Sequence, residues 1–337
     1  MHEARLYQKL EESTVHCSLC AHRCIIREGR QGVCGVRINR GGTLYAATFG
    51  KVIAEAVDPI EKKPLFHFLP GTLSYSLGTI GCNFHCEHCQ NWHISQQTLE
   101  MQSLRDLSPE EGVARALASG SASIAWTYNE PTIWHEYPLA MGTLARERGL
   151  GTVYVTNGYI TEEGLRDLVP MLNAFRVDLK SFSDTFYRKV CGAKLQPVLD
   201  ATALAKELGM HVETVTLVIP GQNDSLEEME ALIRWVLDNL GPDTPMHFTR
   251  FHPDYRMQDA RPTAVEALEK IYERARDMGI HYPYLGNVGN HPYENTYCPA
   301  CGSPVIERSG YAIRMRGLDD HTCTECGGRI EYVSQID

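Results

Sequence analysis

The sequence predicts an α/β fold built around a partial (β/α)6 barrel, with a cysteine-rich segment before it and a zinc-ribbon-like module after it. Between residues 72 and 290, short β-branched or apolar runs alternate with longer helical patterns, which is typical of a parallel sheet. Residues that can bind metals or take part in catalysis follow successive strands, as they do on the active-site face of a barrel. No G-x-G-x-x-G follows the first strand, so a Rossmann dinucleotide site has no support.

The expected strands have the β-branched and aromatic composition of buried strands. They are Leu73–Leu77, Ser123–Thr127, Thr152–Thr156, Phe175–Leu179, Val212–Ile219 and Met246–Phe251. A helical pattern follows each of them, although the first is followed by a cysteine loop before its helix. SPEEGVARALA and TEEGLRDLVPML begin with Ser or Thr followed by acidic residues, which is an N-cap signature. QPVLDATALAKELG and AVEALEKIYERARDMG end at glycine, as helices often do.

The chain of 337 residues divides into three expected parts, which are residues 1–70, 71–290 and 291–337. Its net charge of -10 argues against a general binder of nucleic acid, because such proteins gather Lys and Arg against phosphates. The N-terminus lacks the apolar core of a signal peptide, and no apolar run approaches the roughly 18 residues of a membrane span. We therefore expect a cytoplasmic protein that binds neither nucleic acid nor membranes.

The stretch GCNFHCEHCQNW follows the first expected strand and carries Cys82, Cys86 and Cys89 in a C-x3-C-x2-C array. Three thiolates can hold three irons of a [4Fe–4S] cluster and leave the fourth iron open. The alternative is a zinc site, because zinc normally takes four ligands and a loop histidine can complete the set. The histidines available for that role are His85, His88 and His93.

Two further cysteine groups flank the expected barrel. CPACG and CTECGG near the C-terminus are paired CxxC turns, which predict a zinc ribbon or a rubredoxin-like iron site; their ligands are Cys298, Cys301, Cys323 and Cys326. The N-terminal group has the spacing C-x2-C-x3-C-x9-C, which differs from that of a two-cluster ferredoxin. Structural zinc and an auxiliary iron–sulfur cluster are both open for this group, which consists of Cys17, Cys20, Cys24 and Cys34.

GCNFHCEHCQN resembles the signature of the radical S-adenosylmethionine (SAM) superfamily, specifically its pyruvate formate-lyase activase-like branch. DPIEKKPLFHFLPGT and LCAHRC upstream are similar to the AmmeMemoRadiSam-system radical SAM enzymes, although His88 stands where many superfamily members carry Phe or Tyr. The resemblance implies an oxygen-sensitive enzyme whose [4Fe–4S] cluster cleaves SAM reductively. The resulting 5′-deoxyadenosyl radical would abstract hydrogen from an unidentified substrate. It also implies AMMECR-like and Memo-like partner proteins and an electron donor such as flavodoxin or ferredoxin.

The same resemblance implies which residues bind SAM. Glu130 in TYNEPT matches the acidic position that receives the SAM amino group, with Tyr-Asn-Glu in place of Gly-Gly-Glu. Asp178 and Lys180 in VDLKSF match an Asp-x-Lys element near the sulfonium and carboxylate, and strand alternation places Leu179 opposite them. Asn157 in VTNGY is a candidate for a ribose or substrate contact. Each assignment has a structural alternative. Glu130 could be an exposed acid, Asp178 and Lys180 an ion pair at the barrel mouth, and Asn157 part of an ordinary Asn-Gly turn.

Cys191 in KVCGAKL stands outside the three cysteine groups, after the fourth expected strand. It is either a buried hydrophobic residue or a hydrogen donor on the active-site side. His247 and His252 are candidates for substrate contact or for core and surface positions. Two other functions stay open, which are an activase that makes a glycyl radical on a protein partner and a non-catalytic multi-zinc interaction protein.

Overall fold

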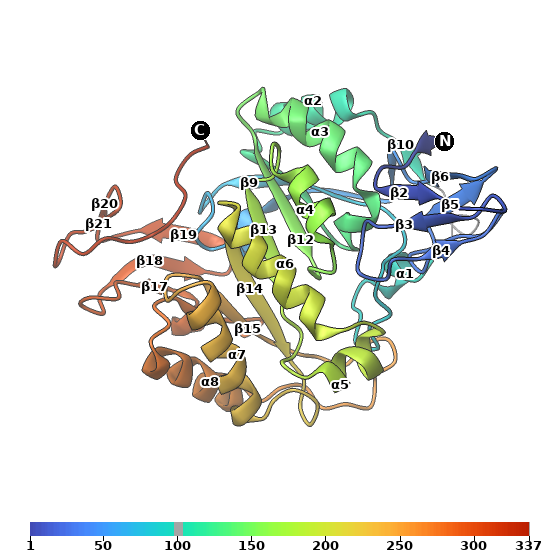
Figure 1. Ribbon diagram of the computed structural model, residues 1–337. Coiled ribbons are helices and arrows are strands. Elements are labelled where there is room, and N and C mark those ends of the chain that lie inside the picture. The colour runs from blue at the N-terminus through green and yellow to red at the C-terminus, as the bar shows by residue number, and fades with distance from the viewer. Residues whose placement is uncertain (98–103, 337) are drawn as a thin grey trace.

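A computed structural model describes residues 1–97 and 104–336 of the chain (Figure 1). Its centre is an eight-stranded sheet whose strands lie side by side in chain order. They are β8 (Ala54–Pro59), β9 (Leu73–Gly78), β11 (Ser123–Trp126), β12 (Gly151–Thr156), β13 (Ala174–Asp178), β14 (His211–Val218), β15 (Met246–Arg250) and β16 (Pro283–Gly286). The strands from β9 to β16 are parallel, whereas β8 is antiparallel to β9. Within the described residues the sheet ends at β8 and β16 and does not close.

The six expected strands are confirmed, each to within one residue at its ends. The sheet contains two strands beyond these six, because β8 and β16 extend it at its two edges. PYLG in β16 is short and carries Pro and Gly, so its sequence has no strand period. AEAVDP in β8 carries two acids and a proline, which an edge strand tolerates. Since β8 lies before residue 71, the sheet also begins earlier than the expected barrel boundary.

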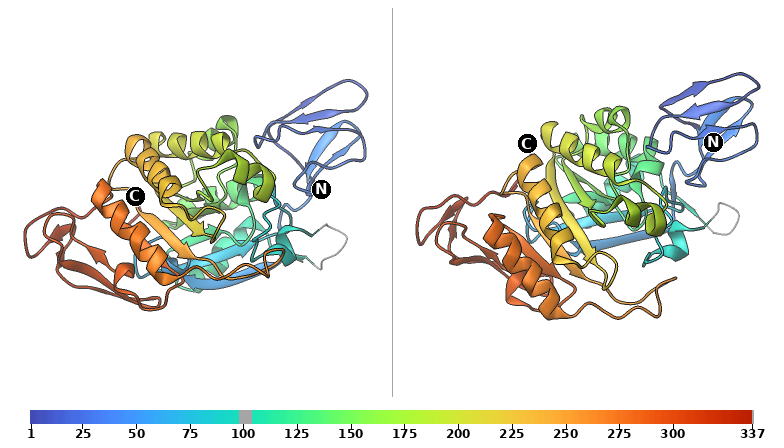
Figure 2. Two further views of the ribbon diagram at one scale, coloured as in Figure 1. Left: turned by 90° about the horizontal axis from the view of Figure 1, so that it is seen from below. Right: turned by 60° about the horizontal axis from the view of Figure 1, so that its bottom comes forward.

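Helices cover one face of the curved sheet (Figure 2). They are α2 (Pro109–Ala118), α3 (Glu136–Arg146), α4 (Glu162–Leu168), α6 (Leu195–Glu207), α7 (Leu226–Asn239) and α8 (Val265–Met278), with short helical turns at α1 (Trp92–Ser95) and α5 (Asp184–Phe186). The predicted N-caps are confirmed, because the Ser108 and Thr161 hydroxyls accept bonds from the N–H groups of Glu111 and Gly164. Helix α4 ends earlier than expected because Pro170 follows its cap. None of the described helices combines the length and apolar character that a bilayer crossing needs.

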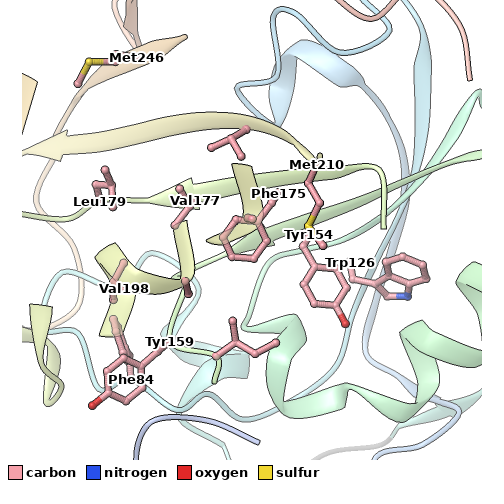
Figure 3. Close-up of a cluster of buried hydrophobic side chains, with 14 of the residues drawn as sticks. Phe84, Trp126, Tyr154, Tyr159, Phe175, Val177, Leu179, Val198, Met210 and Met246 are labelled. Atoms are coloured by element: carbon pink, nitrogen blue, oxygen red, sulfur yellow. The ribbon is translucent and has the colours of Figure 1, made fainter. Parts of the chain in front are cut away.

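Alternate side chains of β13 point to opposite faces of the sheet, one packed into the core and the other lining a cavity. Phe175, Val177 and Leu179 pack among buried side chains beside Trp126 and Tyr154 (Figure 3). The residues between them point to the other face and line a cavity; these are Arg176 and Asp178, followed by Lys180 beyond the strand end. The predicted placement of Leu179 opposite Asp178 and Lys180 is therefore confirmed.

Smaller sheets lie at opposite sides of the central sheet (Figures 1 and 2). The N-terminal strands form two three-stranded sheets, β1 (His2–Glu3), β6 (Thr43–Ala46) and β5 (Arg37–Arg40), and β2 (Tyr7–Lys9), β3 (Val15–Cys17) and β4 (Ile25–Ile26). The C-terminal strands are β17 (Thr296–Tyr297), β18 (Pro304–Ser309) and β19 (Ala312–Met315), with the pair β20 (Leu318–Asp319) and β21 (Thr322–Cys323). A separate pair joins β7 (Lys51–Val52) to β10 (Arg105–Asp106).

Candidate active site

A cavity of about 450 Å³ opens at the carboxyl ends of the parallel strands. The cysteine loop after β9 contributes Cys82, Cys86 and Cys89 to its wall, and Glu130 comes from the segment after β11. Asn157 follows β12, and Asp178 and Lys180 come from the end of β13. The structure thus brings together, in one cavity, the residues that the sequence placed after four successive strands.

The Cys82 loop does not present the compact ligand set of a single metal ion. A tetrahedral zinc ion with Zn–S bonds of about 2.3 Å needs its sulfurs about 3.8 Å apart. Among the described residues, the Cys82 loop does not bring three ligand atoms of any His, Cys, Asp or Glu within 4.8 Å of one another. The ligands of a [4Fe–4S] cluster attach to different irons and stand farther apart. The donor set of three thiolates therefore fits a cluster whose ligands attach to different irons.

The loop histidines do not complete a compact ligand set. His85 is exposed, and its Nδ1 pairs with Gln96 Oε1 at 2.7 Å. His93 is exposed as well. His88 is buried on the cavity wall, and its Nδ1 has no hydrogen-bond partner among the described residues. Burial, followed by the nearby charge of Lys180, lowers the pKa of His88 to about 3, so the ring is neutral at physiological pH.

Glu130 is buried, so the alternative of an exposed acid is wrong. Its carboxylate accepts bonds from the backbone N–H of Thr132 at 2.9 Å, the Thr156 hydroxyl at 2.6 Å and the backbone N–H of Asn157 at 2.7 Å. Burial raises the pKa of Glu130, while these donors act in the opposite direction. A carboxylate offers about four acceptor positions, so one position can still accept a donor from the cavity.

Asp178 lies between two cations on the cavity wall. Lys180 Nζ donates to its Oδ2 at 2.9 Å, and Arg176 Nη1 donates to its Oδ1. Burial alone would raise the pKa of Asp178, but the charges of Arg176 and Lys180 lower it to about 2. Asp178 and Lys180 thus form an ion pair and also face the cavity. The structural ion pair expected as an alternative is therefore compatible with a role in binding. Arg176 was missed from the sequence, although its position two residues before Asp178 places it on the same face.

Asn157 connects two parts of the site. Its side-chain amide donates to Asn83 Oδ1 at 2.8 Å and lies 3.8 Å from Cys82 Sγ. Asn83 was also missed from the sequence; its amide donates to the carbonyl oxygen of Tyr159 at 3.1 Å. Gly158 has a φ of 72°, so the Asn-Gly pair does form the expected turn. The turn therefore positions a polar side chain against the cysteine loop.

Cys191 is buried at the end of a π-helical turn, Tyr187–Cys191, and lies outside the set of described residues that line the cavity. Its thiol shares a hydrogen bond with Cys86, and this bond together with burial raises the pKa of Cys191. Its carbonyl oxygen also accepts the backbone N–H of His85 at 2.9 Å. Cys191 therefore contacts the cysteine loop on the side away from the cavity. A role as hydrogen donor stays a prediction.

The two candidate histidines near β15 have different surroundings. His247 is buried, and its Nε2 lies 2.7 Å from Glu213 Oε2 near the amino end of the sheet, which makes it a core residue. His252 is exposed, and its Nε2 lies 3.0 Å from the side-chain nitrogen of Gln90, a residue on the cavity wall. Only His252 therefore stays near the cavity.

The C-terminal cysteine group is compact. Cys298 and Cys326 have their sulfurs 3.6 Å apart, and those of Cys301 and Cys323 are 3.8 Å apart. All four sulfurs gather within 4.8 Å. These distances suit a single tetrahedral ion, so this is a metal-binding cysteine group of the size that zinc or one iron requires.

Comparisons with known proteins show what the chain is similar to. The family described as the radical SAM superfamily matches residues 77–236. An uncharacterised protein of Methanocaldococcus jannaschii is 46% identical over 335 residues, which cover 99% of this chain and 100% of that protein. The pyruvate formate-lyase-activating enzyme of Clostridium pasteurianum is 19% identical over 59% of this chain and 88% of its own length. A radical SAM methyltransferase from Sphaerobacter thermophilus has a similar fold, with a TM-score of 0.50, 18% identity and coverage of 70% of this chain and 71% of that one.

Proposed function

We propose that this chain, whose residues 77–236 match the radical SAM superfamily, holds a [4Fe–4S] cluster at Cys82, Cys86 and Cys89 beside a SAM-binding cavity. The observation that carries this proposal is the meeting of three thiols, a buried carboxylate and an ionic Asp–Lys pair in one cavity. A cluster bound there supplies one electron for the cleavage of SAM to methionine and a 5′-deoxyadenosyl radical, which abstracts hydrogen from the substrate.

The side chains of the cavity have distinct tasks in this proposal. Glu130 accepts the SAM ammonium group, because it is held in place by three donors and keeps an acceptor position free. Arg176 Nε is buried without a hydrogen-bond partner among the described residues, so Arg176 and Lys180 are suited to hold the SAM carboxylate. Asp178 keeps both cations oriented. The buried walls keep water and stray hydrogen donors from the reacting atoms.

Electron paramagnetic resonance on anaerobically reconstituted, reduced protein tests this function, with and without SAM. We expect a [4Fe–4S]+ signal that changes when SAM is added, and 5′-deoxyadenosine among the products. Changing Cys89 to Ala should abolish the SAM-sensitive signal. Changing Cys191 to Ala should keep that signal, because Cys191 lies behind the loop and outside the cavity wall. Zinc without iron in the Cys82 loop would overturn the proposal and favour the multi-zinc interaction protein.

The activase function is a second candidate, favoured by the similarity to the Clostridium pasteurianum enzyme. It predicts a glycyl radical on a coexpressed protein partner. From the resemblance to AmmeMemoRadiSam-system enzymes, we propose AMMECR-like and Memo-like proteins as partners instead. Anaerobic co-purification of the tagged chain with each class of partner, followed by a search for a glycyl radical signal, distinguishes the two.

A further inference from the structure

The N-terminal cysteine group lies in one small region of the fold. Cys17 ends β3, Cys20 and Cys24 lie in the loop between β3 and β4, and Cys34 precedes β5. Cys17 and Cys34 are buried, and the other two are partly buried. The topology therefore places the four thiols in one small N-terminal region, where none of them is fully exposed.

Their spacing differs from that of the C-terminal group. The C-terminal thiols gather within 4.8 Å, as a single ion requires. Among the described residues the N-terminal group does not bring three ligand atoms that close together, and in this respect it resembles the Cys82 loop. Neither of these two groups is therefore arranged for a single ion, whereas thiols that bind different irons of a cluster need not gather so closely.

The N-terminal group also adjoins the Cys82 loop directly. His22, between Cys20 and Cys24, places its Nε2 2.7 Å from the carbonyl oxygen of Asn83. A Cβ on Gly81 would lie 2.6 Å from the carbonyl oxygen of Cys34, so this glycine permits the backbones to touch. Gly81 and Asn83 flank Cys82 in the sequence. Two contacts therefore join the N-terminal group to both sides of the first loop cysteine.

We propose that Cys17, Cys20, Cys24 and Cys34 hold a second [4Fe–4S] cluster, which relays electrons to the centre at Cys82, Cys86 and Cys89. The relay rests on the proposed function, whereas the identity of the metal does not. A reduced flavodoxin- or ferredoxin-type carrier gives up one electron, and the centre at Cys82 gains one. The N-terminal centre accepts and releases that electron, so it is unchanged overall, and no bond or proton is transferred.

The solvent side of the N-terminal group suits such a carrier. Arg27 and Arg30 are exposed in the segment between Cys24 and Cys34, beside the exposed Glu28, while Arg23 is paired with Glu163. The chain as a whole has a net charge of -10, so this segment is locally more basic than the rest. Local positive charge of this kind would attract an acidic carrier and orient it toward the N-terminal group.

The metal is tested by reconstituting the full chain anaerobically with iron and sulfide and measuring iron, sulfide and zinc per chain. Two clusters of four irons predict about eight irons and eight sulfides. A variant with Cys82, Cys86 and Cys89 changed to Ala should keep half of that iron and a reduced-cluster signal that SAM does not change. Mössbauer spectra of the iron-57 protein count the clusters without any substitution. Zinc at the N-terminal group would overturn the proposal, while a SAM-sensitive signal in the same sample would leave the proposed function standing.

The relay is tested with Cys20 and Cys24 changed to Ser. Dithionite should still reduce the Cys82 centre, whose signal should still respond to SAM, which shows that the barrel is folded and loaded. Reduction of that centre by reduced ferredoxin or flavodoxin, followed by freeze-quench spectroscopy, should be lost. An unchanged rate with the protein carrier would overturn the relay. If SAM had no effect on the wild-type signal, the proposed function would fail instead, and the iron count would still decide the second cluster.

Discussion

The Glu130 carboxylate accepts the backbone N–H of Asn157 at 2.7 Å, and the side chain of the same asparagine lies 3.8 Å from Cys82 Sγ. One turn after β12 therefore connects the carboxylate that follows β11 with the thiol that follows β9. A change at Glu130 should therefore alter the orientation of Asn157 and, in the proposed function, SAM binding as well. This coupling explains why three segments separated in the chain form one site.

Changing Glu130 to Gln should weaken SAM binding with little effect on cluster content. A hydrogen bond to a charged group contributes about 1.5–3 kcal/mol, so the affinity should fall roughly tenfold to a hundredfold. Titration of the SAM-induced change in the cluster signal measures this affinity. Changing the exposed Glu110 to Gln provides a matched control that should bind as the wild type does. Wild-type affinity in the Glu130 variant would contradict the assigned role.

A buried ion pair connects the N-terminal sheets to helix α3, which covers the central sheet. Arg37 of β5 donates to both carboxylate oxygens of Glu136 on α3, at 3.0 and 2.8 Å, and both side chains are almost fully buried. Each partner shifts the pKa of the other toward the charged form, which overcomes the opposing effect of burial. The same carboxylate accepts the backbone N–H of Arg5 at 2.7 Å.

Changing Arg37 to Met should destabilise the protein by about 3–5 kcal/mol, because Glu136 is left as an uncompensated buried charge. Changing Arg37 to Met and Glu136 to Leu together should recover most of that loss, since no buried charge remains. Urea unfolding under anaerobic conditions, with metal content measured for each variant, provides the comparison. Equal stability of the single variant and the wild type would show that the pair does not hold the two parts together.

The C-terminal group should bind one zinc ion, and its removal should loosen the C-terminal module alone. Cys298 and Cys323 are buried with Val305, Ile306 and Ile330, so the ligands form part of a small core. The metal should hold the two CxxC turns together, while Phe66, Tyr282 and Tyr284 attach the same core to the rest of the protein. Changing Cys301 to Ser should lower the zinc content by one ion and expose the module to trypsin, while the SAM-sensitive signal persists. Iron in place of zinc would identify a rubredoxin-like site.

Composition predicted the strands that are buried on both faces, because β-branched and aromatic residues mark them directly. It did not predict β16, whose four residues become a strand only through pairing with β15. Arg176 could have been found from the alternation of side chains along β13, because it lies two residues before Asp178. It was missed because it belongs to no known motif. Asn83 could not be found in this way, since its contacts with Tyr159 and Asn157 depend on how the loops meet. Local patterns thus reveal the elements, whereas long-range contacts complete the site.

His67, in the segment between β8 and β9, hydrogen-bonds both to β16 and to the C-terminal segment. The ring is fully buried, with Nδ1 donating to the carbonyl oxygen of Glu331 at 2.5 Å and Nε2 accepting the Tyr284 hydroxyl at 2.6 Å. Burial lowers the pKa of His67 from 6.5 to about 4, although the charge of Glu213 partly opposes this effect. The neutral ring is therefore the form that the folded protein accommodates.

Stability should fall as the pH is lowered from 6.5 to about 4, because the unfolded chain takes up a proton at His67 in this range and the folded chain does not. The full contribution is present above pH 6.5, and the loss across the window is on the order of 3 kcal/mol. Urea unfolding at several pH values should show a shallower pH dependence for a His67→Phe variant than for the wild type. Loss of metal at low pH affects both proteins alike, so the difference between their slopes isolates the histidine. The exposed His2, changed to Gln, should leave the wild-type slope unchanged. Identical slopes for the His67 variant and the wild type would mean that this ring is not held neutral in the folded protein.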